Sequence, residues 1–195
     1  AIPSSDAYGA GAMVVNGTLL VDDSTFQENN AHAFNAGYGG GLAISNTLQA
    51  TVTNAIFQDN DAWQSSGLWF WGNNATKPPF TLQNSIFTGN GLGNSPGAGF
   101  GGYTGAVFVA NSKASLVGNT LVNNKANNDR GALQIQSSDV LLSKNTISGN
   151  SCGRMAGLYL NYSSHYTVTN NIITNNQSTL TSVANKAAVH IIGGN

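Results

Sequence analysis

The chain of 195 residues has few charged side chains, a single cysteine and no long apolar segment. Only 8% of its residues are Asp, Glu, Lys or Arg, whereas an ordinary soluble domain has roughly 25%. This scarcity excludes coiled coils and helical bundles, which need charged helix formers in quantity. The seven Lys and Arg residues form no cluster, so we expect no nucleic-acid partner.

Two further absences limit how the chain is stabilised and where it resides. Cys152 is alone, so an internal disulfide is impossible and stability must come from packing and hydrogen bonds. No stretch approaches the ~20 consecutive apolar residues of a membrane span, so we expect no membrane insertion by this segment. Hydrophobic residues nevertheless make up 41% of the chain, enough to fill a core. Asparagine (27 residues) and glycine (24 residues) are abundant.

One short phrase, an apolar residue followed by two variable residues and an asparagine, occurs six times. The apolar residues are Phe26, Phe57, Phe87, Leu121, Ile147 and Ile173, and the asparagines are Asn29, Asn60, Asn90, Asn124, Asn150 and Asn176. A further apolar residue stands five positions before each of the first set: Val21, Val52, Leu82, Leu116, Leu142 and Val168. Such self-similarity is the signature of a repeat architecture.

A second phrase, two small residues and then alternating apolar residues, marks the start of each repeat. It begins near residues 11, 40, 66, 105, 131, 156 and 187, and we align Met13 with Leu42 in its first two copies. The alternation is that of short strands, and the shortest spacing, 26 residues between Asn124 and Asn150, suits one turn of a three-sided parallel β-helix. The sequence therefore predicts one all-β domain over residues 1–195. Six complete coils and the opening strand of a seventh give about seven coils with three sheets.

The recurrent asparagines have a physical role in such a solenoid. Equivalent residues stack about 4.8 Å apart, and a side-chain amide both donates and accepts hydrogen bonds, so stacked asparagines bond their neighbours above and below. Asparagine also tolerates the left-handed backbone that sharp bends require. Longer repeats predict loops that leave the coil at its edges, at residues 30–38, 72–79, 91–104 and 177–186.

The two phrases resemble the Gly-Gly-Ala/Leu/Ile and Phe-x-x-Asn repeats of the polymorphic outer-membrane protein family, whose passengers are β-helices of autotransporter type. More broadly, the chain is similar to right-handed parallel β-helix repeat proteins of the pectate-lyase-like superfamily. The resemblance extends from Gly11 to Ile191 and implies a right-handed parallel β-helix. Relatives of this kind include adhesins, polysaccharide lyases and hydrolases, and phage tailspikes, so the resemblance implies an extracellular or cell-surface location and leaves the activity open.

The outward positions of the third repeat carry two tryptophans. If Leu68 and Phe70 point inward, Trp69 and Trp71 point outward on the same strand, because side chains alternate along a strand. In the same registers, neighbouring coils place Ala43, Phe108, Gln134 and Tyr159 beside Trp69, and Ser45, Ala110, Gln136 and Asn161 beside Trp71. The pattern predicts a flat surface of aromatic rings flanked by amides.

This surface has two alternative interpretations. It is a platform on which sugar rings stack, with Trp69, Trp71, Phe108 and Tyr159 as the carbohydrate-binding residues. Alternatively, the loop at residues 91–104 covers the tryptophans with Phe100 and Tyr103, because exposed aromatic patches are uncommon on monomers.

Charged residues give weaker indications. Glu28 and Asp59 share a register in adjacent coils, with Asp61 two residues on, so the three carboxylates either hold a Ca²⁺ ion or are screened by water. Ca²⁺ is the one cofactor that the sequence suggests. Arg130 and Arg154 lie near one edge, a coil apart, and either bind an anionic sugar or are solvated turn residues.

We assign no catalytic residue. His32, His165 and His190 fall in different registers, and neither a nucleophile elbow nor metal-ligand spacing accompanies them. The leading expectation is an extracellular structural or adhesive rod without enzymatic activity, whose partners are further copies of itself or cell-surface and matrix glycans. The alternative is a polysaccharide-binding or polysaccharide-cleaving module, as in tailspikes. Because the sequence stops one strand into a new coil, it is either a piece of a longer rod or a subunit that stacks head to tail.

Overall fold

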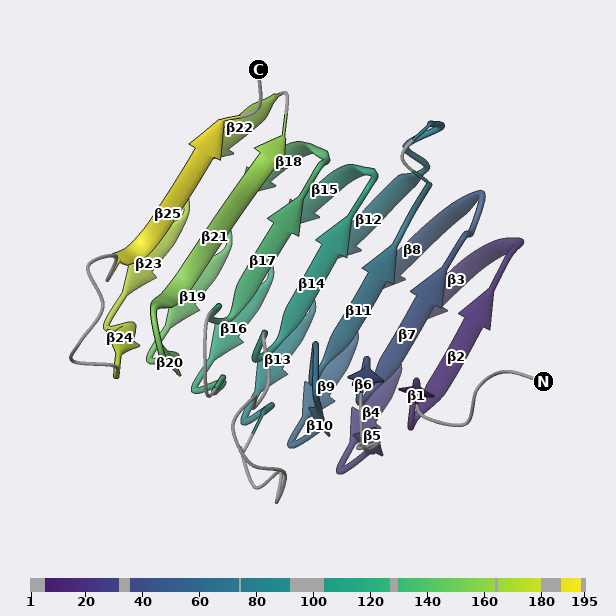
Figure 1. The fold of residues 1–195 in the computed structure, drawn as a ribbon, viewed down its shortest axis with the longest axis horizontal. Helices are drawn as coiled ribbons and strands as arrows, with labels where there is room; N and C mark the ends of the chain where they lie inside the picture. The colour runs from purple at the N-terminus through teal and green to yellow at the C-terminus, as the bar shows by residue number, and fades with distance from the viewer. Residues whose placement is uncertain are drawn as a thin grey trace.

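The structure, a computed structural model, describes residues 6–31, 36–73, 75–91, 104–126, 130–163, 165–179 and 187–193. All regular secondary structure in these ranges is β-strand, and every strand pairing is parallel. Figure 1 shows equivalent strands of successive coils side by side, so that the chain winds along one axis from its N-terminal to its C-terminal end. The predicted all-β parallel solenoid is confirmed.

Three long sheets form the faces of the solenoid. Sheet one consists of β2 (Ala12–Val15), β7 (Leu42–Ser45), β11 (Leu68–Trp71), β14 (Val107–Ala110), β17 (Leu133–Gln136), β21 (Met155–Ser163) and β25 (Ala187–Gly193). Sheet two consists of β3 (Thr18–Asp22), β8 (Gln49–Thr53), β12 (Pro79–Gln83), β15 (Lys113–Val117), β18 (Asp139–Ser143) and β22 (Tyr166–Thr169). Sheet three consists of β4 (Thr25–Gln27), β9 (Ile56–Gln58), β13 (Ile86–Thr88), β16 (Thr120–Val122), β19 (Thr146–Ser148) and β23 (Ile172–Thr174). These strands make six three-sided coils and one further strand, close to the predicted seven.

Short strands also pair outside the three sheets, each in the segment that precedes a strand of sheet one. The pairs are β1 (Asp6–Tyr8) with β6 (Ala36–Tyr38), β5 (Asn30–Ala31) with β10 (Asp61–Ala62), and β20 (Ser151–Cys152) with β24 (Gln177–Ser178). Strands β5 and β6 fall in the expected edge loop at 30–38, and β24 falls in the one at 177–186. These edge segments therefore add small ladders of their own to the solenoid.

The inward rows stack in the predicted registers. Phe26, Phe57 and Phe87 lie in line, with ring centroids 4.8 and 4.5 Å apart, and Leu121, Ile147 and Ile173 continue the row. The row from Val21 to Val168 in sheet two is likewise continuous. Except for Val168, which is 39% exposed in the last coil, both rows belong to one apolar core that runs along the axis between the three sheets.

The alignment of the first coil was wrong by one residue. Ala12, not Met13, pairs with Leu42, and Val14 pairs with Ile44. A shift of one residue moves a side chain to the opposite face of a strand. Met13 and Val15 therefore point outward and are 46% and 47% exposed, while Ala12 packs against the core.

The asparagine ladder is confirmed in detail. Each ladder asparagine donates its backbone N–H and its side-chain Nδ2 to Oδ1 of the next ladder asparagine, as Asn60 does to Asn90 at 3.1 and 3.0 Å. From the second rung on, Nδ2 also donates to a backbone carbonyl of the preceding coil, for example Asn90 to Phe57 at 2.9 Å. The ladder runs without a break from Asn29 to Asn176.

A second asparagine ladder lies at the corner between sheets two and three, and the sequence analysis missed it. Asn119, Asn145 and Asn171 repeat the same bonds, with Nδ2 of Asn119 donating to Oδ1 of Asn145 at 2.9 Å. Ser85 holds the register one coil earlier, where its hydroxyl accepts from the backbone N–H of Ala55. At two corners of the solenoid, hydrogen bonds between stacked side chains therefore join successive coils.

The left-handed residue of the third-sheet bend is the one before each ladder asparagine, and not the asparagine itself as the sequence analysis suggested. Positive φ angles occur at Glu28 (54°), Asp59 (52°), Gly89 (64°) and Asn123 (56°), at successive coils of this bend. The ladder asparagines are not among the residues with positive φ, so the preceding residue makes the turn. These positions favour Gly, Asn and Asp because such residues tolerate this region of backbone space.

The small residues before each sheet-one strand complement the size of the sheet-three anchors. A Cβ on Gly41 would lie 2.8 Å from Cδ1 of Phe57, and one on Gly67 would lie 2.9 Å from Cδ1 of Phe87. The next coils place Ala106 and Ala132 in this register, where the anchors Leu121 and Ile147 are smaller. Glycine thus accompanies phenylalanine in two coils and alanine accompanies the aliphatic anchors of the next two, whereas in the sixth coil Gly157 accompanies Ile173.

Candidate functional site

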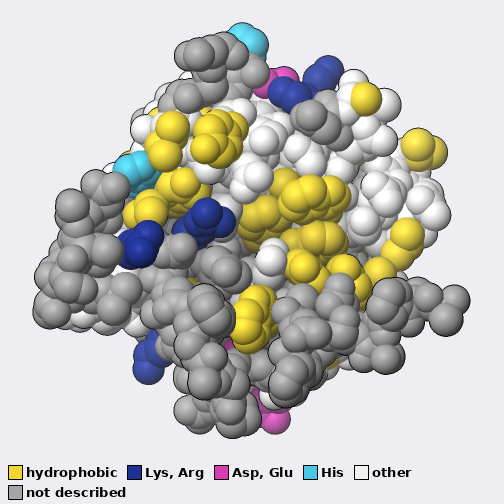
Figure 2. All heavy atoms as spheres, viewed as in Figure 1, with side chains coloured by type: hydrophobic (Ala, Val, Ile, Leu, Met, Phe, Trp, Pro, Cys, Tyr) yellow, Lys and Arg dark blue, Asp and Glu magenta, His cyan; other side chains and the backbone are white. Residues whose placement is uncertain are grey.

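The outer face of sheet one presents two rows of side chains in the predicted registers. Trp69 pairs with Ala43 and Phe108, and Gln134 pairs with Phe108 and Tyr159. The second row places Ser45, Trp71, Ala110, Gln136 and Asn161 side by side. Figure 2 shows hydrophobic side chains gathered across this face, with basic side chains beside them.

The two tryptophans differ in accessibility, although both point outward. Trp69 is 6% exposed because Tyr8 and Tyr38 pack against it, with ring centroids 6.0 and 5.0 Å away. Tyr8 and Tyr38 themselves stack at 4.7 Å. Trp71 remains 38% exposed, and its ring lies parallel to that of Phe108 at 6.0 Å. Trp71 is therefore the accessible ring of the pair.

Two residues that the sequence analysis offered as a cover, Phe100 and Tyr103, lie outside the described residues. Within the described ranges, the pair of strands β1 and β6 supplies the cover over Trp69. Sequence reasoning missed Tyr8 and Tyr38, since neither belongs to the repeated phrases. Each of them is an aromatic residue that stands shortly before a small-residue phrase, and this shared position is the signal that could have found them.

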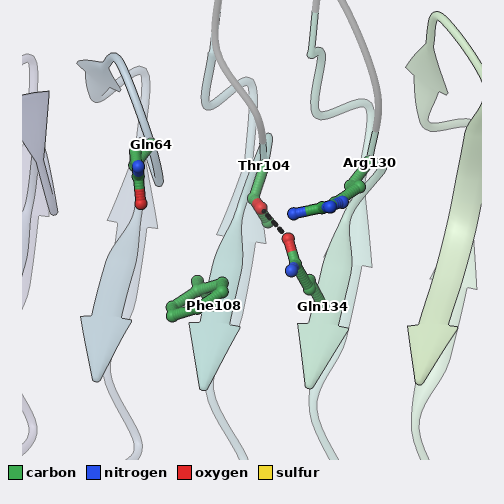
Figure 3. Close-up of a pocket in the computed structure, with 5 residues that line it drawn as sticks. All are labelled: Gln64, Thr104, Phe108, Arg130 and Gln134. Atoms are coloured by element: carbon green, nitrogen blue, oxygen red, sulfur yellow. Dashed lines mark hydrogen bonds between the residues drawn. The ribbon is translucent and has the colours of Figure 1, made fainter. Parts of the chain in front are cut away.

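A cleft of about 220 Å³ opens beside the aromatic row, lined by Gln64, Thr104, Phe108, Arg130 and Gln134. Figure 3 shows Arg130 and Gln134 pointing toward each other and toward Thr104, with the Phe108 ring on the neighbouring strand. The Thr104 hydroxyl donates to Oε1 of Gln134 at 2.8 Å, and both of these residues are fully buried. The cleft thus has a polar floor that packing holds in place.

Arg130 connects the cleft to the next aromatic residue of the row. Its guanidinium lies over the Tyr159 ring, 5.2 Å from the ring centroid. Its backbone bridges Thr104 on one side and Met155 on the other, which fixes the residue at the start of its coil. Phe108 and Tyr159 are each 5% exposed, so Trp71 is the accessible ring among the four predicted carbohydrate-binding residues.

A family profile described as a right-handed β-helix region matches residues 49–195, which is most of the chain. The chain belongs to this β-helix family. Neither a curated protein nor a solved structure matches it. The match confirms the right-handed parallel β-helix that the family resemblance implied, while the finer resemblance to outer-membrane protein repeats stays a prediction.

The carboxylates of the suggested calcium site occupy bends of the β-helix. Glu28 and Asp59 are the left-handed residues of successive coils, and each accepts a hydrogen bond from the preceding glutamine, Gln27 at 3.1 Å and Gln58 at 3.0 Å. Asp61 begins β10, beyond the bend. Among the described residues, no three His, Cys, Asp or Glu side chains gather where they could hold a metal ion. The calcium site stays a prediction.

A charged cluster on the β-helix lies apart from the cleft, at the start of sheet two. Asp139 accepts hydrogen bonds from Nζ of Lys77 at 3.3 Å and from Nδ1 of His165 at 3.4 Å. Partial burial raises the pKa of Asp139, but these two partners lower the pKa by more, so that it lies below its ordinary value. The side chain of Asp139 is 32% exposed and that of His165 is 84% exposed, so this cluster is a surface ion pair.

The described ranges also contain no helix that could cross a membrane.

Proposed function

We propose that this β-helix is an extracellular, non-enzymatic rod that adheres to polysaccharide through the outer face of sheet one. The observation that carries the proposal is the exposed Trp71 ring, which lies parallel to the Phe108 ring at the edge of the cleft. A sugar ring has an apolar face that stacks on such a ring, while its hydroxyl groups need hydrogen-bonding partners. Gln136, which is partly buried in the same outward row as Trp71 and two strands away, supplies an amide.

The composition of sheet one supports binding over cleavage. Its seven strands contain aromatic, amide and small side chains but neither Asp nor Glu. Hydrolysis of a glycosidic bond ordinarily uses a pair of carboxyl groups that flank the bond. A rigid scaffold with rings held by packing also suits adhesion, because little conformational freedom is lost when a ligand binds.

The test compares polysaccharide binding by the whole chain with binding by Trp71→Ala. Removing an aromatic anchor from a binding surface costs on the order of 1–2 kcal/mol or more, so we expect the Kd to rise about tenfold. Ile86→Ala is the matched control, because Ile86 is 42% exposed on the outer face of sheet three. Affinity electrophoresis in gels that contain different polysaccharides measures both variants.

Two results would count against the proposal. Equal retardation of Trp71→Ala and the unchanged chain in every gel would show that sheet one is not the binding face. The appearance of new reducing ends or unsaturated sugars during incubation would show that the β-helix is an enzyme, as in the polysaccharide-cleaving alternative.

A further inference from the structure

We propose that Asn16 is a site of spontaneous deamidation, at which the side-chain amide is converted to a carboxylate. This modification is independent of the proposed function. The chain contains two Asn-Gly pairs, Asn16-Gly17 and Asn90-Gly91, and the structure holds them in opposite environments. Glycine after asparagine favours deamidation, because it has no side chain to shield the backbone nitrogen that attacks the amide.

The reaction is a ring closure followed by hydrolysis. The backbone nitrogen of Gly17 loses its proton and attacks Cγ of Asn16, so that a C–N bond forms and the side-chain nitrogen leaves as ammonia. Water then opens the cyclic imide at either carbonyl and leaves aspartate or isoaspartate. The sum is asparagine plus water giving aspartate plus ammonia. Because the nucleophile and the amide belong to adjacent residues, the rate depends on whether the fold lets them meet.

The turn at Asn16 leaves both reacting groups accessible. Asn16 and Gly17 form the corner between β2 and β3, with positive φ angles of 66° and 80°, and both residues are exposed. The backbone N–H of Asn16 donates to the Ser45 carbonyl at 3.0 Å, and the Gly17 carbonyl accepts from Leu48 at 2.7 Å. Within the described part of the chain, neither the Asn16 side chain nor the Gly17 N–H has a hydrogen-bond partner. A Cβ on Gly17 would meet no atom within 4 Å, so nothing crowds the approach of its nitrogen to Cγ.

Asn90-Gly91 has the same two residue types in the opposite state. Asn90 is fully buried, and its side chain bonds to its neighbours in the ladder and to the Phe57 carbonyl. The Gly91 N–H donates to the Asn60 carbonyl at 2.8 Å, so the nitrogen that would attack is also occupied. Asn90 can therefore react only in molecules whose coils have opened locally.

Asn46 separates the effect of the following glycine from the effect of exposure. It occupies the same corner one coil later, is exposed and has a φ of 52°, and its backbone N–H donates to the Trp71 carbonyl. The next residue is Thr47, which is 3% exposed. A β-branched side chain is stiff and lies close to its own backbone nitrogen, which hinders ring closure. We therefore expect Asn46 to remain an amide.

Deamidation at Asn16 changes the charge of the first coil and leaves the core in place. The new carboxylate lowers the formal net charge by one unit from −1. Isoaspartate also adds a methylene group to the backbone between β2 and β3, which are end strands of sheets one and two in the described structure. An end strand pairs on one side, so the distortion is confined to one neighbouring coil. We expect the modified chain to stay folded.

The experiment follows the two Asn-Gly pairs while the whole folded chain is incubated at mildly alkaline pH. A protease that cleaves before aspartate releases residues 6–21, in which Asn16 is the single asparagine, and one that cleaves after aromatic residues releases residues 88–100 with Asn90. Mass spectrometry measures the conversion of each, and new cleavage before position 16 distinguishes aspartate from isoaspartate. We expect Asn16 to convert at least about tenfold faster than Asn90, and the two rates to become similar in guanidinium chloride, where all coils are open.

Variants of the corner test the mechanism. Asn16→Gln should abolish the fast conversion, because glutamine must close a larger ring. Thr47→Gly should make Asn46 labile, since it places a second Asn-Gly pair in the same corner. Circular dichroism and thermal unfolding confirm that each variant is folded.

Three results would overturn the inference. Equal rates at Asn16 and Asn90 in the folded chain would show that the fold does not select between the two pairs. A rate at Asn16 that rises about tenfold on unfolding would show that the turn protects it. An unreactive Asn46 in folded Thr47→Gly would show that the geometry of this corner prevents ring closure.

Discussion

Asn90 offers the sharpest test of what holds the coils together. It lies in the middle of the ladder and is fully buried. Its side chain makes four hydrogen bonds. Oδ1 accepts from the backbone N–H and Nδ2 of Asn60, at 3.1 and 3.0 Å, and Nδ2 donates to the Phe57 carbonyl and to Oδ1 of Asn124, both at 2.9 Å. Asn90→Ala removes all four bonds and leaves a cavity where the amide was.

The loss of stability expected for Asn90→Ala follows from what each hydrogen-bond partner of Asn90 loses. The buried backbone N–H of Asn60 is deprived of the acceptor that it has in the structure, which costs about 1–3 kcal/mol. The other three bonds contribute roughly 0.5–1.5 kcal/mol each, with some overlap because the removed amide no longer has to be desolvated. We therefore expect Asn90→Ala to lower the free energy of unfolding by about 3–5 kcal/mol. This is a large share of the roughly 5–15 kcal/mol that stabilises an ordinary domain.

Asn29→Ala is the control, because it removes the same amide from the first rung. Asn29 is only partly buried, its backbone N–H still reaches Asn60, and its side chain makes one bond, from Nδ2 to Oδ1 of Asn60 at 2.9 Å. We expect this variant to lose about 0.5–1.5 kcal/mol. Urea denaturation measures both free energies, and native-state hydrogen exchange at the Asn60 amide measures the local opening. Similar small losses in both variants, with unchanged exchange at Asn60, would refute the idea that the ladder stabilises the stack.

Two further predictions concern packing and pH. Gly67→Ala places a Cβ 2.6 Å from the Ala106 carbonyl oxygen and 2.9 Å from the Phe87 ring, so it should cost about 1–3 kcal/mol by overpacking. Adding Phe87→Leu should cost less than the sum of the two single changes, and additive free energies in urea denaturation would argue against the size complementarity. Hydrogen bonds from Thr53 and then Asn54 lower the pKa of Asp22 below its ordinary value of 3.8. A carboxyl group with a lowered pKa adds stability above its unfolded value, and this is lost as the pH falls through the folded value. The thermal midpoint should therefore stay level from pH 7 to about pH 5 and fall below about pH 4, less steeply in Asp22→Asn. An equal fall in that variant would exclude Asp22 as a contributor.

The rows of the solenoid were predictable because each is a strict repetition. Phe26, Phe57 and Phe87 recur in the same phrase as the ladder asparagines, and the parallel coils turn that recurrence directly into contact. The register of the first coil was not predictable in this way. Gly11-Ala12-Met13 matches the small-small-apolar phrase as well as the observed register, in which Ala12 pairs with Leu42, does. Only pairing with the second coil distinguishes Ala12 from Met13 as the inward residue.

The second ladder was missed in the sequence because residues other than asparagine occupy its position in the earlier coils. Asn119, Asn145 and Asn171 are 26 residues apart, but Ser85 and Ala55 occupy the register in earlier coils. A search for a repeated asparagine therefore finds only three matches at this position, too few to indicate a ladder along the whole chain. The hydroxyl of Ser85 still accepts the backbone bond, so the function of the position persists while the residue type changes.

The cleft depends on contacts that no pattern encodes. Thr104 and Arg130 lie outside the strands of sheet one, and their separation in the sequence gives no sign that both line the cleft with Gln134. The different exposure of Trp69 and Trp71 is likewise decided by Tyr8 and Tyr38, which come from outside the repeat. The register of the repeats therefore predicted which residues lie on the outer face of sheet one. Tertiary packing determines that Trp71 is accessible and that Trp69 is buried.

The last three coils also have an evolutionary consequence. The spacing of 26 residues is shared by both ladders from Asn119 and Asn124 to Asn171 and Asn176, and each rung bonds only to its immediate neighbours. A tandem duplication of one such unit would present the same amides above and below as the original does. The length of the rod is thus a trait that gene duplication can change in single steps, while the surface around Trp71, which belongs to an earlier coil, is left in place.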